Sequence, residues 1–207
     1  FVLVGYGTKA GLAPMHTWLP DAHSQAVTPI SALLSGVLLK TAVYVIIRFA
    51  IITNKAVGTA YTSNLFMFFG LISIIVAAVF IIVQKDLKRL LAYSSVEHIG
   101  IVVLGLGFGG RFGYYGALLH IFNHAVTKAL MFFCAGKIVE KYNTHNMRKI
   151  KGAVVSLPFA GVFTLITVFA LGGSPPFSIF FSEIAILYAG FVKGNYVVSV
   201  AYILILA

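Results

Sequence analysis

The stretch TPISALLSGVLLKTAVYVIIR, residues 28–48, constrains the fold more than any other part of the sequence. It is apolar enough to cross a lipid bilayer, yet it carries Lys40 in its interior. A charge at bilayer depth costs at least about 2.5–3.5 kcal/mol, so such a lysine pairs, faces water or has a function. Lys40 follows Pro29 by eleven residues, roughly 16 Å along a helix and near the middle of the hydrocarbon core. We predict a broken transmembrane helix over residues 29–50 with a lysine at its midplane, which indicates ion or proton translocation.

The alternative for Lys40 is a side chain that extends to the interface and keeps its charge in water. The depth of Lys40 argues against this, whereas Arg48 lies near a helix end and fits it better. In a low-dielectric site the neutral amine is favoured, so a lysine there could accept and release a proton.

The composition is that of a membrane protein. Of 207 residues, 60% are hydrophobic and 10% are charged, against about 25% charged in a soluble domain. The apolar runs are continuous rather than alternating, which favours helices over a barrel. The net charge of +10 comes from basic residues between the runs, as in the positive-inside rule, so we expect a lipid bilayer and no nucleic acid as partner. The sequence predicts an all-α polytopic membrane protein.

Both ends of the sequence lie inside apolar runs, so we expect residues 1–207 to be a single transmembrane domain, a fragment of a longer transporter domain lacking its N-terminal and C-terminal helices. Expected helices follow the break at residues 14–23 and cover residues 29–50, 65–83, 90–108, 114–139, 153–171 and 177–192, with another from Tyr196. Gly/Pro-rich breaks at residues 11–14 and 172–176 each separate two apolar segments. Such a matched pair is typical of an inverted-repeat transporter.

The loops give an expected orientation. Three basic residues lie on one side, namely Arg48, Lys55 and Arg111. Nine lie on the other: Lys85, Lys88, Arg89, Lys137, Lys141, Arg148, Lys149, Lys151 and Lys193. This asymmetry places residues 84–89 and 140–151 in the cytoplasm.

Titratable residues recur inside the apolar segments. His120, His124 and Lys128 are spaced i, i+4 and i+8, on one face of a helix, which suggests a proton relay. A static polar contact between helices and a metal site on the two histidines are the alternatives. Glu183 lies seven residues past Pro176; its alternative role is a carboxylate stabilised by a helix N-terminus.

Glu97 and His98 are neighbours and therefore point to different sides of their helix. We place them near the cytoplasmic end, as a possible path for proton uptake rather than its centre. Nucleotide, metalloprotease and hydrolase motifs of the types GxxxxGK[ST], HExxH and GxSxG are absent. The five acidic residues are scattered, and Cys134 is the single cysteine. We expect no catalytic, cofactor-binding or metal-binding residues in this chain.

Four runs carry a resemblance to a known family. They are PMHTWLPDAHSQAVTPISALLSGVLLKTAVYVIIR, QKDLKRLLAYSSVEHIG, HIFNHAVTKALMFFCAG and LGGSPPFSIFFSE. Together they resemble the antiporter-like membrane subunits of complex I, of Mrp antiporters and of membrane-bound [NiFe] hydrogenases. VEHIG, HIFNHAVTKAL and GSPPFSIFFSE are most similar to the membrane component F of hydrogenase-4, the formate hydrogenlyase type.

The resemblance implies two inverted five-helix repeats, each with a discontinuous helix. Lys40 matches the central lysine on the first broken helix, whose partner carboxylate lies upstream of Phe1. Lys128 matches a connecting lysine, with His120 and His124 beside it, and Glu183 matches the terminal charged position. One helix departs from the family pattern. Residues 65–83 lack the usual lysine or histidine, and Asn64 at the edge is the nearest polar substitute.

The resemblance therefore implies a proton- or cation-translocating subunit, itself without a redox centre, in a prokaryotic inner membrane. It would couple electron transfer in a hydrogenase or NADH:quinone oxidoreductase complex to ion pumping. Nickel–iron, iron–sulfur clusters or FMN would belong to a peripheral redox arm and other subunits. Two alternatives remain: a free-standing Mrp-type Na⁺/H⁺ antiporter, or a non-pumping scaffold for a soluble redox arm.

Overall fold

The computed structural model describes residues 1–206, which are helical and contain no strand. Long apolar segments without interior proline form the membrane helices, and glycine or proline ends them. The helices are α1 (Val2–Ala10), α2 (Trp18–Gln25), α3 (Thr28–Leu33), α4 (Leu39–Val57), α5 (Thr59–Val83), α6 (Leu87–Phe108), α7 (Gly110–Tyr142), α8 (Ala153–Ser156), α9 (Pro158–Leu171), α10 (Ser178–Val192) and α11 (Tyr196–Leu206). A π-helical segment, Leu34–Leu38, joins α3 to α4 into one continuous rod.

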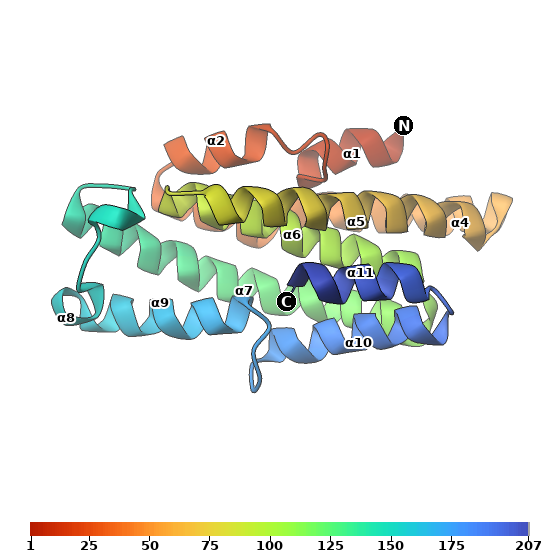
Figure 1. Cartoon of the computed structure of the whole chain (residues 1–207). Helices are drawn as coiled ribbons and strands as arrows, with labels where there is room; N and C mark the ends of the chain where they lie inside the picture. The colour runs from red at the N-terminus through yellow and green to blue at the C-terminus, as the bar shows by residue number, and fades with distance from the viewer. Residues whose placement is uncertain (207) are drawn as a thin grey trace.

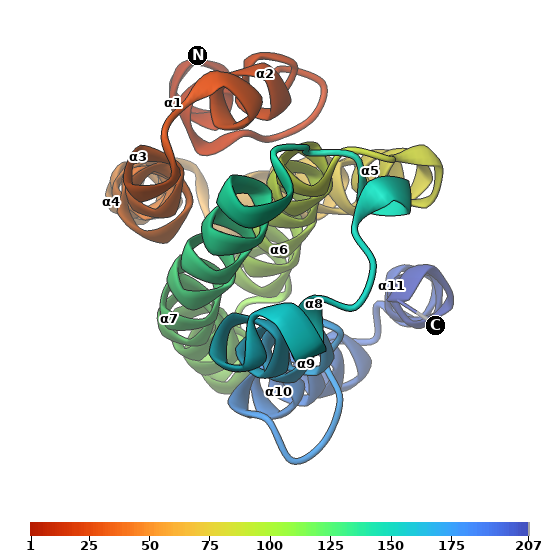
Figure 2. The ribbon, with the colours of Figure 1, turned by 90° about the vertical axis from the view of Figure 1, so that its left-hand side faces the viewer.

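The helices run roughly parallel to one long axis (Figure 1). Four continuous segments are long and apolar enough to cross a membrane: Thr28–Val57, Thr59–Val83, Leu87–Phe108 and Gly110–Tyr142. Seen from the end, α6 and α7 lie between the first pair, α1 and α2, and the second pair, α9 and α10 (Figure 2). α6 is buried along nearly its whole length. The all-α membrane architecture predicted from composition is confirmed.

Two helices are discontinuous. Residues 11–17 separate α1 from α2, and Gly11 there adopts φ 80°, a left-handed conformation that favours glycine. Residues 172–177 separate α9 from α10, with Gly173 at φ 62°. The two pairs run in opposite directions along the bundle (Figure 1), as an inverted repeat requires. Both breaks predicted from Gly/Pro-rich segments are confirmed.

Hydrogen bonds with the surrounding helices hold the first break in place. The Trp18 indole N–H donates to the Thr8 carbonyl across the break, at 2.7 Å. The Ala13 amide donates to Ser73 Oγ of α5, at 2.9 Å. Irregular backbone at membrane depth needs such partners because lipid supplies none.

One end of the bundle gathers the two basic loops. The Leu87 amide donates to the His145 carbonyl at 2.9 Å, and the Met147 amide donates to the Lys85 carbonyl at 3.0 Å. Arg89 of α6 forms an ion pair with Asp21 of α2. The two backbone hydrogen bonds place the loops at residues 84–86 and 143–152 side by side. The orientation predicted from the basic residues requires these loops to lie at the same end.

Lys193 was assigned to the wrong end. Its Nζ donates to Ser63 Oγ at 2.6 Å and to the Gly107 carbonyl at 3.0 Å. Ser63 starts α5 and Gly107 ends α6, so Lys193 lies opposite the basic loops. The prediction treated α9 and α10 as two separate membrane crossings, whereas they are the two halves of one discontinuous membrane helix. The corrected count is eight against four, and its direction is unchanged.

Candidate functional site

Lys40 lies on a continuous helix, not on a broken one as predicted. The helix containing it runs from Thr28 to Val57. Its irregularity is the π-helical segment, in which the Leu39 amide donates to the Leu34 carbonyl five residues back. Lys40 follows directly, is partly buried, and donates from Nζ to the Ser35 carbonyl. The prediction failed because Pro29 begins this helix, where proline is tolerated, rather than breaking it.

The lysine on the first broken helix is Lys9. It lies in the last turn of α1, next to the break, and is exposed among the described residues. No function was predicted for Lys9 from the sequence. Its position two residues before Gly11 was the signal that could have identified it.

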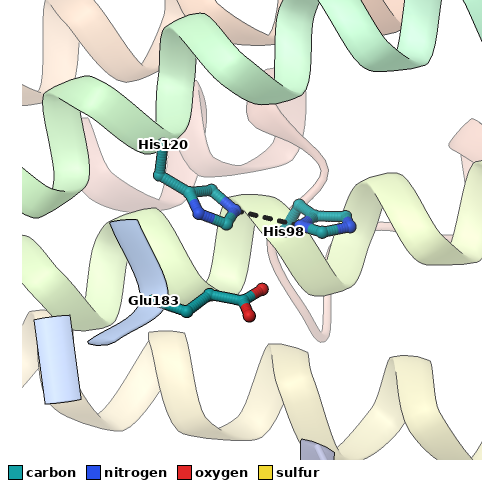
Figure 3. A group of neighbouring side chains, drawn as sticks. All are labelled: His98, His120 and Glu183. Atoms are coloured by element: carbon teal, nitrogen blue, oxygen red, sulfur yellow. Dashed lines mark hydrogen bonds between the residues drawn. The ribbon is translucent and has the colours of Figure 1, made fainter. Parts of the chain in front are cut away.

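The centre of the site is a hydrogen-bonded pair of histidines from neighbouring helices. His98 Nδ1 of α6 lies 2.9 Å from His120 Nε2 of α7 (Figure 3). His120 Nδ1 lies 2.9 Å from Ser182 Oγ of α10. The His124 ring centroid is 4.6 Å from that of His98. All three histidines are buried, so the stripe predicted on α7 gathers partners from two further helices.

His98 therefore belongs to the centre of the site, and its predicted place at the cytoplasmic end is wrong. It lies halfway along α6, eleven residues after Leu87. The expected helix started three residues too late, at position 90, which moved His98 toward its end. Glu97, beside it, is partly buried and lies at the same level of α6. Both residues thus lie deep in the bundle.

Glu183 of α10 reaches this cluster from the second break. Its carboxylate and one ring nitrogen each of His98 and His120 lie within 4.8 Å of one another (Figure 3). The carboxylate also lies against Gly173, at the position that a Cβ on residue 173 would occupy. The three groups have the donor types of a transition-metal site, which the sequence did not predict. The two histidines, however, use the ring nitrogens that face each other for their mutual hydrogen bond.

Lys128 extends the cluster along α7 and is fully buried. Its Nζ donates to the Leu91 carbonyl of α6 at 3.0 Å. The segment with Lys40 packs directly on α7: a Cβ added at Gly36 would lie 3.6 Å from the Ala125 carbonyl. Asn64, expected as the polar substitute between the two lysines, is exposed near the start of α5 and does not lie between them.

Sequence reasoning missed the hydroxyl groups of this site, Ser35, Ser95 and Ser182, all fully buried. Serine is common and carries little signal by itself. Only Ser95 has helical spacing from a titratable residue of its own helix, because it precedes His98 by three residues.

Comparisons with known proteins agree with this geometry. The family described as "NADH:quinone oxidoreductase/Mrp antiporter, TM" matches residues 1–206. The chain belongs to this family. The family resemblance predicted from the four sequence runs is thus confirmed, and with it a multi-pass membrane protein.

Similar curated proteins include a hydrogenase-4 component F homolog of Methylacidiphilum infernorum. It is 41% identical over 193 residues, covering 93% of this chain and 40% of that protein. NADH-quinone oxidoreductase subunit M of Pseudomonas aeruginosa is 36% identical over 188 residues, covering 91% of this chain and 37% of that protein. The chain thus spans about 40% or less of the length of these relatives.

Two solved structures have the same fold. A chain of the Mrp complex from Dietzia sp. DQ12-45-1b superposes with a TM-score of 0.90 at 21% identity, over 99% of this chain and 38% of that one. A chain of an archaeal membrane-bound sulfane sulfur reductase superposes with a TM-score of 0.87 at 26% identity, over 97% of this chain and 43% of that one. The antiporter-like fold predicted from the sequence is confirmed.

Proposed function

We propose that this chain is the ion-translocating part of a membrane subunit that couples electron transfer in a multisubunit complex to proton movement. The observation that carries the proposal is the buried, hydrogen-bonded pair of His98 and His120, which the partly buried Glu183 approaches. Lys128 lies on the same face of α7 as His120. Titratable groups inside a membrane protein are costly and mark ion pathways. The names of the relatives, a hydrogenase-4 component and an NADH-quinone oxidoreductase subunit, favour a redox-driven complex.

The geometry suits lateral transfer of a proton. A neutral imidazole accepts a proton at one nitrogen and releases one from the other. A proton reaching His98 can pass from its Nδ1 to His120 Nε2 across 2.9 Å. His120 then releases a proton from Nδ1 toward Ser182, next to Glu183. Lys128 and His124 supply protons along α7, and Glu183, at the second break, gates exit.

The first half of the path requires a revised assignment. The resemblance places the central lysine on the first broken helix, and Lys9 is the lysine there. We therefore assign to Lys9 the central role expected of Lys40, with a carboxylate partner outside this chain. Lys40, on the continuous helix that packs against α7, then becomes the connecting group between Lys9 and Lys128.

The test uses the full-length protein in its native complex, in inside-out membrane vesicles. Lys128→Met should lower proton uptake per electron transferred by about tenfold, because removing one positioned proton carrier interrupts the path. Lys137→Met is the matched control: Lys137 lies on the same helix but is exposed and paired with Glu140 at 2.9 Å. Unchanged uptake in Lys128→Met, with normal electron transfer, would show that the chain is a scaffold.

The partners are part of the proposal: other membrane subunits and a peripheral redox arm, in a prokaryotic inner membrane. Metal and flavin analysis of the purified complex distinguishes the possible arms. Nickel with hydrogen evolution identifies a hydrogenase, and FMN with NADH oxidation identifies a complex I-type enzyme. An intact particle containing neither would favour the free-standing Na⁺/H⁺ antiporter, to whose Mrp-type structures the fold is similar.

A further inference from the structure

A chain of polar contacts connects the partly buried Lys40 with the buried Lys128 where three helical segments meet. Ser35 lies in the π-helical segment, Ser95 and Leu91 lie on α6, and Lys128 lies on α7. Ser35 Oγ is 2.8 Å from Ser95 Oγ. Ser95 Oγ donates to the Leu91 carbonyl at 3.0 Å, and Lys128 Nζ donates to the same oxygen at 3.0 Å. At the other end, Lys40 Nζ donates to the carbonyl of Ser35 itself.

The hydrogen bonds have a direction. Because Ser95 donates its proton to the Leu91 carbonyl, it can only accept from Ser35. Both hydroxyl protons therefore point from the Lys40 side toward the Lys128 side. Ser95 is already satisfied by its bond within α6, so the contact with Ser35 is not needed to satisfy Ser95.

We propose that Ser35 and Ser95 form a hydroxyl bridge that passes a proton between Lys40 and Lys128. The inference rests on the proposed function, because it assumes that both lysines carry the transported proton. It also accounts for the absence of a lysine or histidine within α5, the helix expected to connect the two halves. The connection runs through the π-helical segment and α6 instead.

The step balances in protons. The Lys40 ammonium turns from the Ser35 carbonyl to Ser35 Oγ and gives up one proton there. Ser35 passes its own hydroxyl proton to Ser95, and Ser95 passes its proton to a neutral Lys128 amine beside the shared Leu91 carbonyl. The transfer is concerted, so neither hydroxyl holds a charge. Lys40 ends neutral, Lys128 ends as an ammonium, and the two hydroxyls rotate back before the next transfer.

The closeness of the lysines favours one proton on the pair. They lie at the two ends of one chain of polar contacts, and two ammonium groups in a low-dielectric interior repel each other. The titratable groups on the helices packed around this pair include His23 of α2, Glu97 and His98 of α6, and His120 and His124 of α7. Glu97 offers the negative charge that stabilises the proton once it reaches Lys128.

The experiment uses the full-length protein in its native complex, in inside-out vesicles. Ser35→Ala and Ser95→Ala should each lower proton uptake per electron by about tenfold, since each removes one member of the bridge. Ser35→Thr and Ser95→Thr retain the hydroxyl and should recover most of it. The matched controls are Ser31→Ala, a buried serine one turn earlier that bonds the His23 carbonyl at 3.2 Å, and Ser94→Ala, the neighbour of Ser95. Both controls should pump normally.

A second readout separates a proton bridge from a packing role. If hydroxyl protons move in the step, uptake by the unsubstituted complex should slow in D₂O, and this isotope effect should change in the alanine variants. The inference is wrong if the alanine variants lose assembled complex in proportion to their loss of proton uptake and their isotope effect equals that of the unsubstituted complex. If Lys128→Met stops uptake while both serine variants pump normally, the bridge is wrong and the proposed function stands. If Lys128→Met also pumps normally, the proposed function fails.

Discussion

Ser182 fixes the orientation of His120, and its substitution measures what that contact contributes. Ser182→Ala leaves the buried His120 Nδ1 without its partner at 2.9 Å. Hydrogen bonds between membrane helices contribute about 0.6–1.7 kcal/mol, so we expect a destabilisation of about 1 kcal/mol and a lower rate of proton uptake. Thermal unfolding of the purified complex and vesicle assays measure the two effects. Ser178→Ala, an exposed position one turn earlier, is the control. If the two variants have the same unfolding temperature and the same rate of proton uptake, Ser182 is not part of the functional site.

The charged residues of the site could be predicted from sequence, whereas their partners could not. Charge inside an apolar run is a strong signal because it is expensive. His120, His124, Lys128 and Glu183 were found in this way, and the structure brings them together with His98. A buried serine costs little free energy, since its hydroxyl can donate to a carbonyl of its own helix. Ser182 therefore gave no signal in the sequence, and Ser95 gave only its spacing from His98.

Glycines set the distance between α5 and α6. A Cβ at Gly70 would lie 2.8 Å from the Leu104 amide nitrogen, and one at Gly100 would lie 2.9 Å from the Gly70 carbonyl. Small residues allow such close approach of membrane helices. Gly70→Ala must therefore push the two backbones apart, at a cost of about 1–3 kcal/mol.

Thermal unfolding of the complex measures this cost. Gly5→Ala is the control, because Gly5 is helical and nothing lies within 4 Å of its added Cβ. We expect the Gly70 variant to unfold at a lower temperature than the control. Since α6 carries His98 and Ser95, proton uptake should fall in the same variant. Identical melting of both variants would show that the helices separate without cost.

Helix existence could be predicted from sequence, but helix continuity could not. Gly58 alone separates α4 from α5, although residues 53–63 are polar enough to suggest a loop. The polar residues are carried by helical turns at the end of the bundle. Conversely, besides the confirmed break at residues 11–17, the helix that carries Lys40 was predicted to be broken, whereas Pro29 lies in the first turn of a continuous helix. Proline at the first turn of a helix and proline within a break look alike without the fold.

The orientation of the whole molecule follows from its basic residues. With Lys193 moved, eight basic residues lie at the end with the loops at 84–86 and 143–152, and Arg48, Lys55, Arg111 and Lys193 lie at the other. The paired backbone of the two loops makes them one surface. From the positive-inside rule we predict that this surface faces the cytoplasm.

Cysteine labelling tests this orientation in the full-length protein, with all of its cysteines except Cys134 replaced. Lys55→Cys and Lys151→Cys put single thiols at exposed positions at opposite ends of the bundle. A membrane-impermeant maleimide should label position 55 in intact cells and position 151 in inside-out vesicles. The buried Cys134 is the control for unspecific labelling, and no signal is expected from it in either preparation. The reversed pattern would invert the bundle. It would also reverse the direction in which Glu183 and the second break face, so the exit proposed there would become the side of uptake.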